Sequence, residues 1–198
     1  MQDKSIHLKN QSSLFLIEVI IAVFFFAITA VVCIRIFVKS HNVTDESREL
    51  TKGYIEADNM AQVFMNSGAN IEVIVSRYSE YAVVLSQEGN YTGTIVICYD
   101  SDFNPIEHPT DDITYTINST AYELVLTQKL EDSSDTYNDC SSGSLQGYAC
   151  TATISIYDVE LSDDLITDTY QEDISVYEDN KILTLPLDLY LGDIDTEL

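Results

Sequence analysis

The chain has 198 residues, with nine Lys and Arg against 33 Asp and Glu, and a formal net charge of −24. Such an acidic chain repels the phosphate backbone of DNA and RNA, so nucleic acid is excluded as an expected partner. The length allows one modest globular domain beside an extended segment, and the sequence contains no internal repeat.

Residues 1–13 form a polar leader that contains Lys4 and Lys9. Positively charged residues that flank a membrane segment tend to stay in the cytoplasm. We therefore expect the N-terminus to be cytoplasmic and the C-terminal part of the chain to face outward.

An apolar stretch follows from Leu14 to Val38, and Glu18 and Arg35 are its only charged residues. As a helix, its 25 residues are enough to cross about 30 Å of hydrocarbon. A removable secretory signal fits poorly, because its apolar core would be shorter and a small-residue cleavage site would follow it. Residues 14–38 are therefore predicted to form a transmembrane helix.

Glu18 is the most informative residue of this stretch. A carboxylate costs roughly 2.5 to 3.5 kcal/mol at the centre of a bilayer, so a plain anchor would gain by replacing it with Leu. The unpaired N–H groups and the dipole of a helix N-terminus stabilise an acid in the first turns. Two interpretations follow: Glu18 lies shallow, near the cytoplasmic headgroups, or a partner neutralises it.

The block Ser13-Leu14-Phe15-Leu16-Ile17-Glu18 resembles the processing site of type IV prepilins and type II secretion pseudopilins. In that family a membrane peptidase cuts after a small residue, usually Gly, and a Glu follows near the start of an apolar helix. The resemblance implies that prepilin peptidase cuts between Ser13 and Leu14, with Ser13 in place of Gly and Leu14 in place of Phe or Met. It also implies that the freed amine of Leu14 meets Glu18 of a neighbouring subunit and so sets the register of a filament.

Residues 39–67 are predicted to continue the helix, because no Gly or Pro occurs from Leu14 to Lys52. Gly53 is expected to weaken the helix by up to about 1 kcal/mol, and Asn66-Ser67-Gly68 is typical of a helix end. Apolar residues recur at three- and four-residue intervals, which indicates an amphipathic helix, with a short coiled-coil or stalk segment as the alternative. The predicted apolar stripe consists of Val43, Leu50, Tyr54, Ala57, Ala61 and Phe64.

Residues 68–198 consist of short alternating runs separated by acidic and Ser- or Asn-rich connectors, a pattern typical of antiparallel β-structure. The run 71–85 fits either a helix end or a strand. Pro186 cannot donate a hydrogen bond to a neighbouring strand, which places the last strand at a sheet edge. The predicted strands are 94–99, 113–117, 122–128, 152–156 and 183–191. The fold class is therefore α+β, a long N-terminal helix with an antiparallel β head.

The head is strongly acidic. From Tyr78 onward, Lys129 and Lys181 stand against 25 Asp and Glu, which gives a formal charge of −23. We interpret this as an extracellular surface kept soluble by acid-rich loops, with binding of cations or basic partners as the alternative.

Asp100, Asp102, Asn104 and Asp111 are weak candidates for calcium ligands, because they offer oxygens at spacings like those of an EF-hand loop. Pro105 stands where that loop needs Gly, and the segment follows a strand as an ordinary hairpin connection would. We therefore expect no metal and no cofactor.

Two cysteines of the head are close enough in the sequence to form a disulfide. Cys140 and Cys150 flank a Ser/Gly-rich loop and could form a disulfide, which would add about 2 to 3 kcal/mol to the stability of the fold.

No histidine is placed to pair recognisably with a Ser or Cys nucleophile, so an enzyme is not expected.

Beside these features, the resemblance of the N-terminal block implies a minor pilin or pseudopilin of a type IV pilus or a type II secretion-like filament. Its expected partners are prepilin peptidase, the membrane and other pilin-like subunits, which would pack through their helices into a cell-surface filament. The alternative is a membrane-anchored extracellular binding domain that never polymerises.

Overall fold

The structure is a computed structural model that describes residues 4–107, 119–137, 146–159 and 179–194, with side chains from Phe15 onward. The chain divides into two units, Met1–Glu49 and Leu50–Leu198. A long N-terminal helix precedes a five-stranded antiparallel sheet, so the predicted α+β class is confirmed.

In the first unit, the described residues form the N-terminal part of the long helix α1 (Lys4–Asn66). The helix begins ten residues before Leu14, the start expected from the apolar stretch. Residues 4–13 contain no Gly or Pro, so nothing in their backbone delays the helix start. Its end at Asn66 is the one predicted, and Gly68 follows with a φ of 63°.

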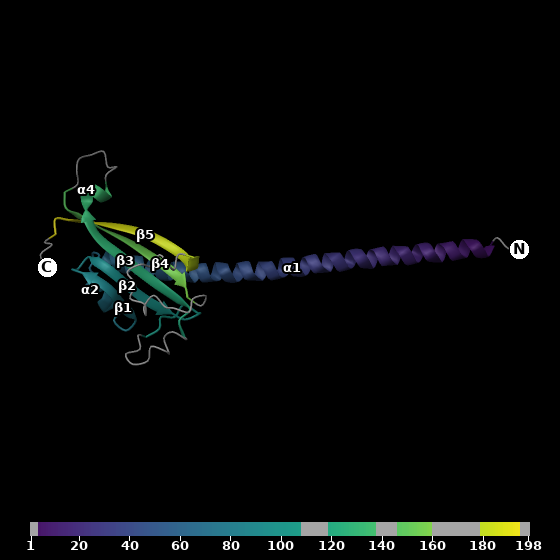
Figure 1. Ribbon diagram of the computed structural model, residues 1–198, viewed down its shortest axis with the longest axis horizontal. Helices are drawn as coiled ribbons and strands as arrows, with labels where there is room; N and C mark the ends of the chain where they lie inside the picture. The colour runs from purple at the N-terminus through teal and green to yellow at the C-terminus, as the bar shows by residue number, and fades with distance from the viewer. Residues whose placement is uncertain (1–3, 108–118, 138–145, 160–178, 195–198) are drawn as a thin grey trace. The chain divides into compact units, whose positions relative to one another are not determined.

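The second unit is built on the sheet, whose strands follow one another in the order β1-β2-β3-β4-β5 (Figure 1). Four of the five predicted strands are present, and the fifth, 113–117, lies outside the described residues. The ambiguous run 71–85 contains both elements: α2 (Ile71–Arg77), capped by Asn70, and the start of β1. The remaining elements are β1 (Ala82–Glu88), β2 (Thr92–Tyr99), β3 (Tyr122–Asp132), α4 (Ser133–Thr136), β4 (Tyr148–Asp158) and β5 (Lys181–Gly192).

Strand β5 lies at the edge of the sheet and pairs with β4, with Pro186 opposite Thr153. Leu185 and Leu187 are half-buried on the face that packs against the core, whereas Pro186 is exposed. The edge position and the alternation are therefore confirmed, because a residue without an N–H is tolerated where no further strand follows.

The core lies between one face of the sheet and the C-terminal turns of α1, together with α2. The predicted stripe of α1 is confirmed at Ala57, Ala61 and Phe64, which are buried. It is wrong at Val43, Leu50 and Tyr54, which are 45% to 53% exposed, and Gly53 is buried instead. A Cβ on Gly53 would lie 3.2 Å from Ile156 Cδ1, so the small residue lets the helix approach the sheet closely. The buried residues of α1 are Gly53, Ala57, Met60, Ala61 and Phe64.

Gly93 lies where the backbones of β2 and β1 approach each other closely. It lies on β2 between Gln87 of β1 and Gln128 of β3, and a Cβ there would collide with the carbonyl oxygen of Ser86. We expect Gly93→Ala to lower the free energy of unfolding by about 1 to 3 kcal/mol, because a backbone atom cannot move aside as a side chain can. The measurement is denaturant unfolding of the full chain in detergent, followed by circular dichroism.

Gly53→Ala is the matched control. The nearest atom there is the flexible end of Ile156, and alanine gains up to about 1 kcal/mol of helix propensity. Equal losses for the two variants would contradict the close contact at Gly93.

Candidate functional site

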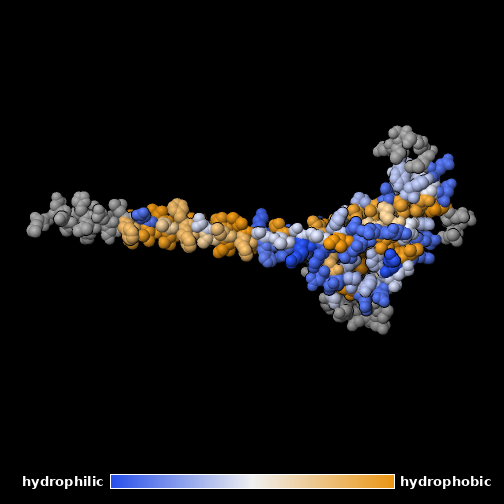
Figure 2. All heavy atoms as spheres, turned by 180° about the vertical axis from the view of Figure 1, so that it is seen from behind, coloured by the Kyte–Doolittle hydropathy of each residue, from blue (hydrophilic) through white to orange (hydrophobic). Residues whose placement is uncertain are grey.

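The candidate site is the apolar segment of α1, Phe15–Val38. All of its side chains are exposed except that of Ala30, which is half-buried. Phe26 and Phe37 are 75% and 72% exposed, and apolar surface extends along most of this part of the helix (Figure 2). In the described part of the chain, α1 is the one helix long and apolar enough to cross a membrane.

The hydroxyl of Thr29 is satisfied inside this helix. It donates to the carbonyl oxygens of Phe25 at 3.0 Å and Phe26 at 2.9 Å. A helix satisfies the hydrogen-bonding groups of its own backbone, and these two hydrogen bonds satisfy the hydroxyl group of Thr29 within the same helix. The segment therefore places no unpaired hydroxyl at position 29 in an apolar environment.

Glu18 and Arg35 are both exposed, and neither has a hydrogen bond or ion pair to another described side chain. Ser13 and Leu14 belong to the backbone of α1, and their side chains lie outside those described. The segment therefore presents two charges of opposite sign, one near each end, in an otherwise apolar surface.

Polar residues begin directly after Val38. Lys39 is exposed, and His41 Nδ1 lies 2.7 Å from Asp45 Oδ2, one turn further along the helix. The apolar segment of the helix therefore ends at Val38, as predicted from the sequence.

The Asp100 turn follows β2. Asp100 Oδ1 accepts hydrogen bonds from the backbone N–H groups of Asp102 and Asn104, both at 2.9 Å, and the Asn104 amide donates to both carboxylate oxygens. Slight burial acts to raise the pKa of Asp100, but these hydrogen bonds outweigh it and hold the pKa below its ordinary value. Lys52 Nζ lies 3.1 Å from Asp102 Oδ1.

The turn is therefore held by hydrogen bonds from its own donors. Asp111, the fourth weak calcium candidate, lies outside the described residues. Within the described ranges no cluster of three or more His, Cys, Asp or Glu is placed to hold a metal ion.

Cys150 is a free thiol, fully buried in β4, and its Sγ donates to the carbonyl oxygen of Tyr91 at 3.4 Å. Burial raises the pKa of this thiol to about 11, which disfavours the reactive thiolate. Cys140 lies outside the described residues, so a bridge between the two cysteines stays a prediction.

Two buried polar residues of β3 were missed by the sequence analysis. Gln128 is 2% exposed, and its Nε2 donates to the carbonyl oxygens of Ala69 at 2.7 Å and Tyr91 at 3.0 Å, joining the turns that precede α2 and β2. Glu123 is fully buried, and its Oε1 accepts a hydrogen bond from Cys98 Sγ at 3.8 Å. The only signal in the sequence was that each of these polar residues belongs to a predicted strand that is otherwise mostly apolar.

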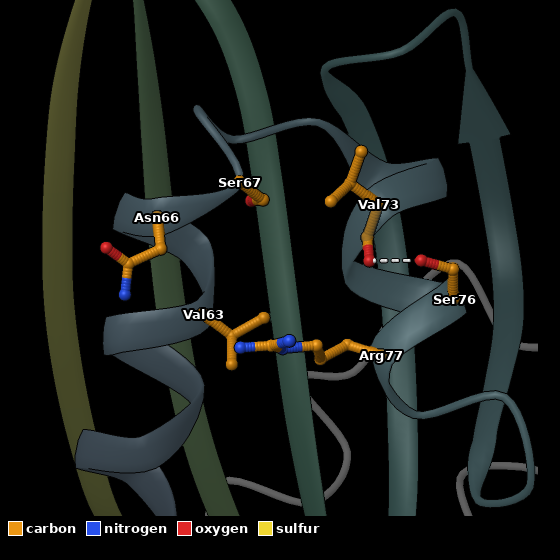
Figure 3. A pocket seen from close by; sticks show the side chains of 6 residues that line it. All are labelled: Val63, Asn66, Ser67, Val73, Ser76 and Arg77. Carbon is orange, nitrogen blue, oxygen red and sulfur yellow. Dashed lines mark hydrogen bonds between the residues drawn. The ribbon is translucent and has the colours of Figure 1, made fainter.

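A groove of about 290 Å³ lies between the end of α1 and α2 (Figure 3). Arg77 reaches across it from α2 toward Val63, and the Ser76 hydroxyl donates to its own helix, to the carbonyl oxygen of Val73 at 2.8 Å. Arg77 is the only titratable side chain among the residues that line the groove. The lining therefore provides one positive charge but no pair of acid and base groups.

Comparisons of the chain with protein-family models, with curated proteins and with solved structures found no match. The function is therefore argued from the helix and its charges alone.

The buried phenol of Tyr99 makes the folding stability of the head depend on pH. Its side chain is 2% exposed, and its hydroxyl donates to Glu56 Oε2 at 3.5 Å. Burial, and then the negative charge of Glu56, raise the pKa of Tyr99 far above its ordinary value. Below the unfolded pKa of about 10 the phenol is protonated in both states, and its contribution to stability is fully present.

As the pH rises above about 10, the unfolded chain releases the proton and the folded chain retains it, so stability falls by up to about 1.4 kcal/mol per pH unit. We expect Tyr99→Phe to reduce this alkaline loss, measured by unfolding between about pH 9 and pH 11. The exposed Tyr54→Phe serves as the control. An unchanged pH slope in Tyr99→Phe would contradict the burial of this phenol.

Proposed function

We propose that this chain is a type IV pilin-like subunit, a minor pilin or pseudopilin that assembles into a filament through α1. The observation that carries the proposal is the uncovered apolar segment Phe15–Val38 with Glu18 near its start. Lipid covers such a segment before assembly, and the helices of other subunits cover it afterwards.

Glu18 is the feature that favours assembly over simple anchoring. A charge in an apolar segment costs free energy in lipid, and no described side chain compensates it within one copy. An ammonium freed at Leu14 by removal of residues 1–13 would neutralise Glu18 of a neighbour. The cost in lipid then becomes an attraction between subunits.

The proposal also assigns a topology. The N-terminus lies in the cytoplasm, where prepilin peptidase acts on the leader before assembly, and the acidic head lies outside the cell. Secretion and surface pili both use such subunits. Neither a secretion filament nor a surface pilus requires the head to catalyse a reaction.

A second candidate is a membrane-anchored extracellular domain that binds a partner and never polymerises. It is favoured by the position of Glu18, only five residues into the apolar stretch, where the cost near the headgroups is small. The two candidates differ in whether Glu18 is needed.

Replacing Glu18 separates the candidates. We expect Glu18→Gln to lower incorporation into filaments by about tenfold or more while the amount of protein in the membrane stays unchanged, because only the charge is removed. The measurement is the amount of subunit in sheared filaments against that in membranes. Glu46→Gln, an exposed carboxylate beyond the apolar segment, is the matched control. Normal assembly of Glu18→Gln would favour the anchored domain.

The start of the mature chain is a separate test. We expect N-terminal sequencing of protein taken from filaments to begin at Leu14. Ser13→Arg should block this cleavage, since a bulky charged side chain replaces the small residue, and should hold the full-length chain in the membrane. Filaments built from chains that still begin at Met1 would refute the processing step.

A further inference from the structure

Arg35 is the second charge of the apolar segment, and the pairing of Glu18 with a freed amine leaves it without a role. It is exposed, like Glu18, and no described side chain pairs with it. It follows Glu18 by seventeen residues, which on a helix correspond to a rise of about 25 Å and a rotation of about 100°. The two charges therefore cannot meet within one copy.

Parallel copies in the same register cannot pair them either. Such copies bring Glu18 against Glu18 and Arg35 against Arg35, so that like charges repel in an environment of low dielectric constant. A shift of seventeen residues instead brings Glu18 of one copy level with Arg35 of the next. After this shift, residues 15–21 of one copy lie level with residues 32–38 of the next, so apolar surface remains in contact on both sides of the pair over these seven residues.

We propose that Arg35 forms an ion pair with Glu18 of a second, parallel copy of this chain that is shifted by seventeen residues along the helix axis. This inference rests on the proposed function and adds a neighbour and a distance to it. The carboxylate of Glu18 has two oxygens, so it can accept the Leu14 amine of one neighbour and the Arg35 guanidinium of another. Because the two charges lie about 100° apart around the helix, each copy meets one neighbour with Glu18 and another with Arg35. Such a head-to-tail contact continues into an open assembly rather than closing as a dimer.

The shift also explains why the pair belongs to a filament rather than to the bilayer. About 25 Å is nearly the thickness of the hydrocarbon layer, about 30 Å, and identical helices in one bilayer lie at the same depth. In the bilayer each charge can reach only the headgroups at its own end of the segment. The two charges meet only when one copy is displaced out of the membrane, so the pair favours the assembled state.

Cysteine cross-linking tests the shift directly. Ile21 and Val38 each follow one of the charges by three residues, lie on the corresponding side of the helix and are exposed. The test uses the full chain with Cys33→Ser, because Cys33 is the exposed thiol among the described cysteines. In this background we expect oxidation of Ile21→Cys with Val38→Cys in filaments to give a ladder of covalent multimers. The Cys33→Ser background and each single cysteine variant are the controls.

A ladder from the double variant supports the shift. Dimers from Ile21→Cys alone, without a ladder from the double variant, would show packing in the same register and overturn it. Filaments that form normally but give no cross-link in any variant overturn it as well.

Removing the charge gives a second, independent readout. We expect Arg35→Leu to lower the filament yield by about tenfold, Arg35→Lys to retain most of it, and Lys39→Leu to leave it unchanged, with equal amounts of all three in the membrane. Equal yields from Arg35→Leu and Lys39→Leu would refute the pair.

The two proposals fail in different ways. Filaments that need Glu18 but not Arg35 would remove this inference and leave the proposed function standing. Normal assembly of Glu18→Gln, or no filaments from the unaltered chain, would remove both.

Discussion

The apolar surface of α1 from Phe15 to Val38 is exposed along almost its whole length, and no other described part of the chain covers it. Each square ångström of such surface costs about 25 cal/mol in water, so lipid or another protein has to cover this segment. A helix suits either environment because it satisfies its own backbone groups. Glu18 and Arg35 are the exceptions in this surface, and their positions near its two ends decide where the segment is stable.

The same helix meets the opposite requirement in the second unit. Gly53, Ala57 and Ala61 are small enough for the helix backbone to approach the sheet, and Met60 and Phe64 fill the space between them. One periodic segment thus changes from a helix that is apolar all round to one that buries a single stripe. Most charged side chains in the described part of the second unit lie at its surface, and Glu123 is fully buried.

The elements that depend on local pattern were predicted well. The presence of strands β2, β3, β4 and β5, the alternation of β5, the edge position of Pro186 and the end of α1 at Asn66 all follow from side-chain patterns and from the limits of proline and glycine. The buried stripe was predicted correctly at Ala57, Ala61 and Phe64, but Gly53 was missed because it was counted only as a weak helix former. Its role depends on Ile156, about a hundred residues away in the sequence.

The sequence by itself determined the length of the apolar segment, its two charges, the acidic head and the order of helix and strands, since each depends on residues close together in the chain. Only the tertiary structure decided which face of α1 is buried, that Gln128 joins two turns, and that Asn104 donates to both carboxylate oxygens of Asp100. The physical reason is that burial and hydrogen-bond partners depend on which residues meet in space. Local periodicity narrows those meetings, and packing selects among them.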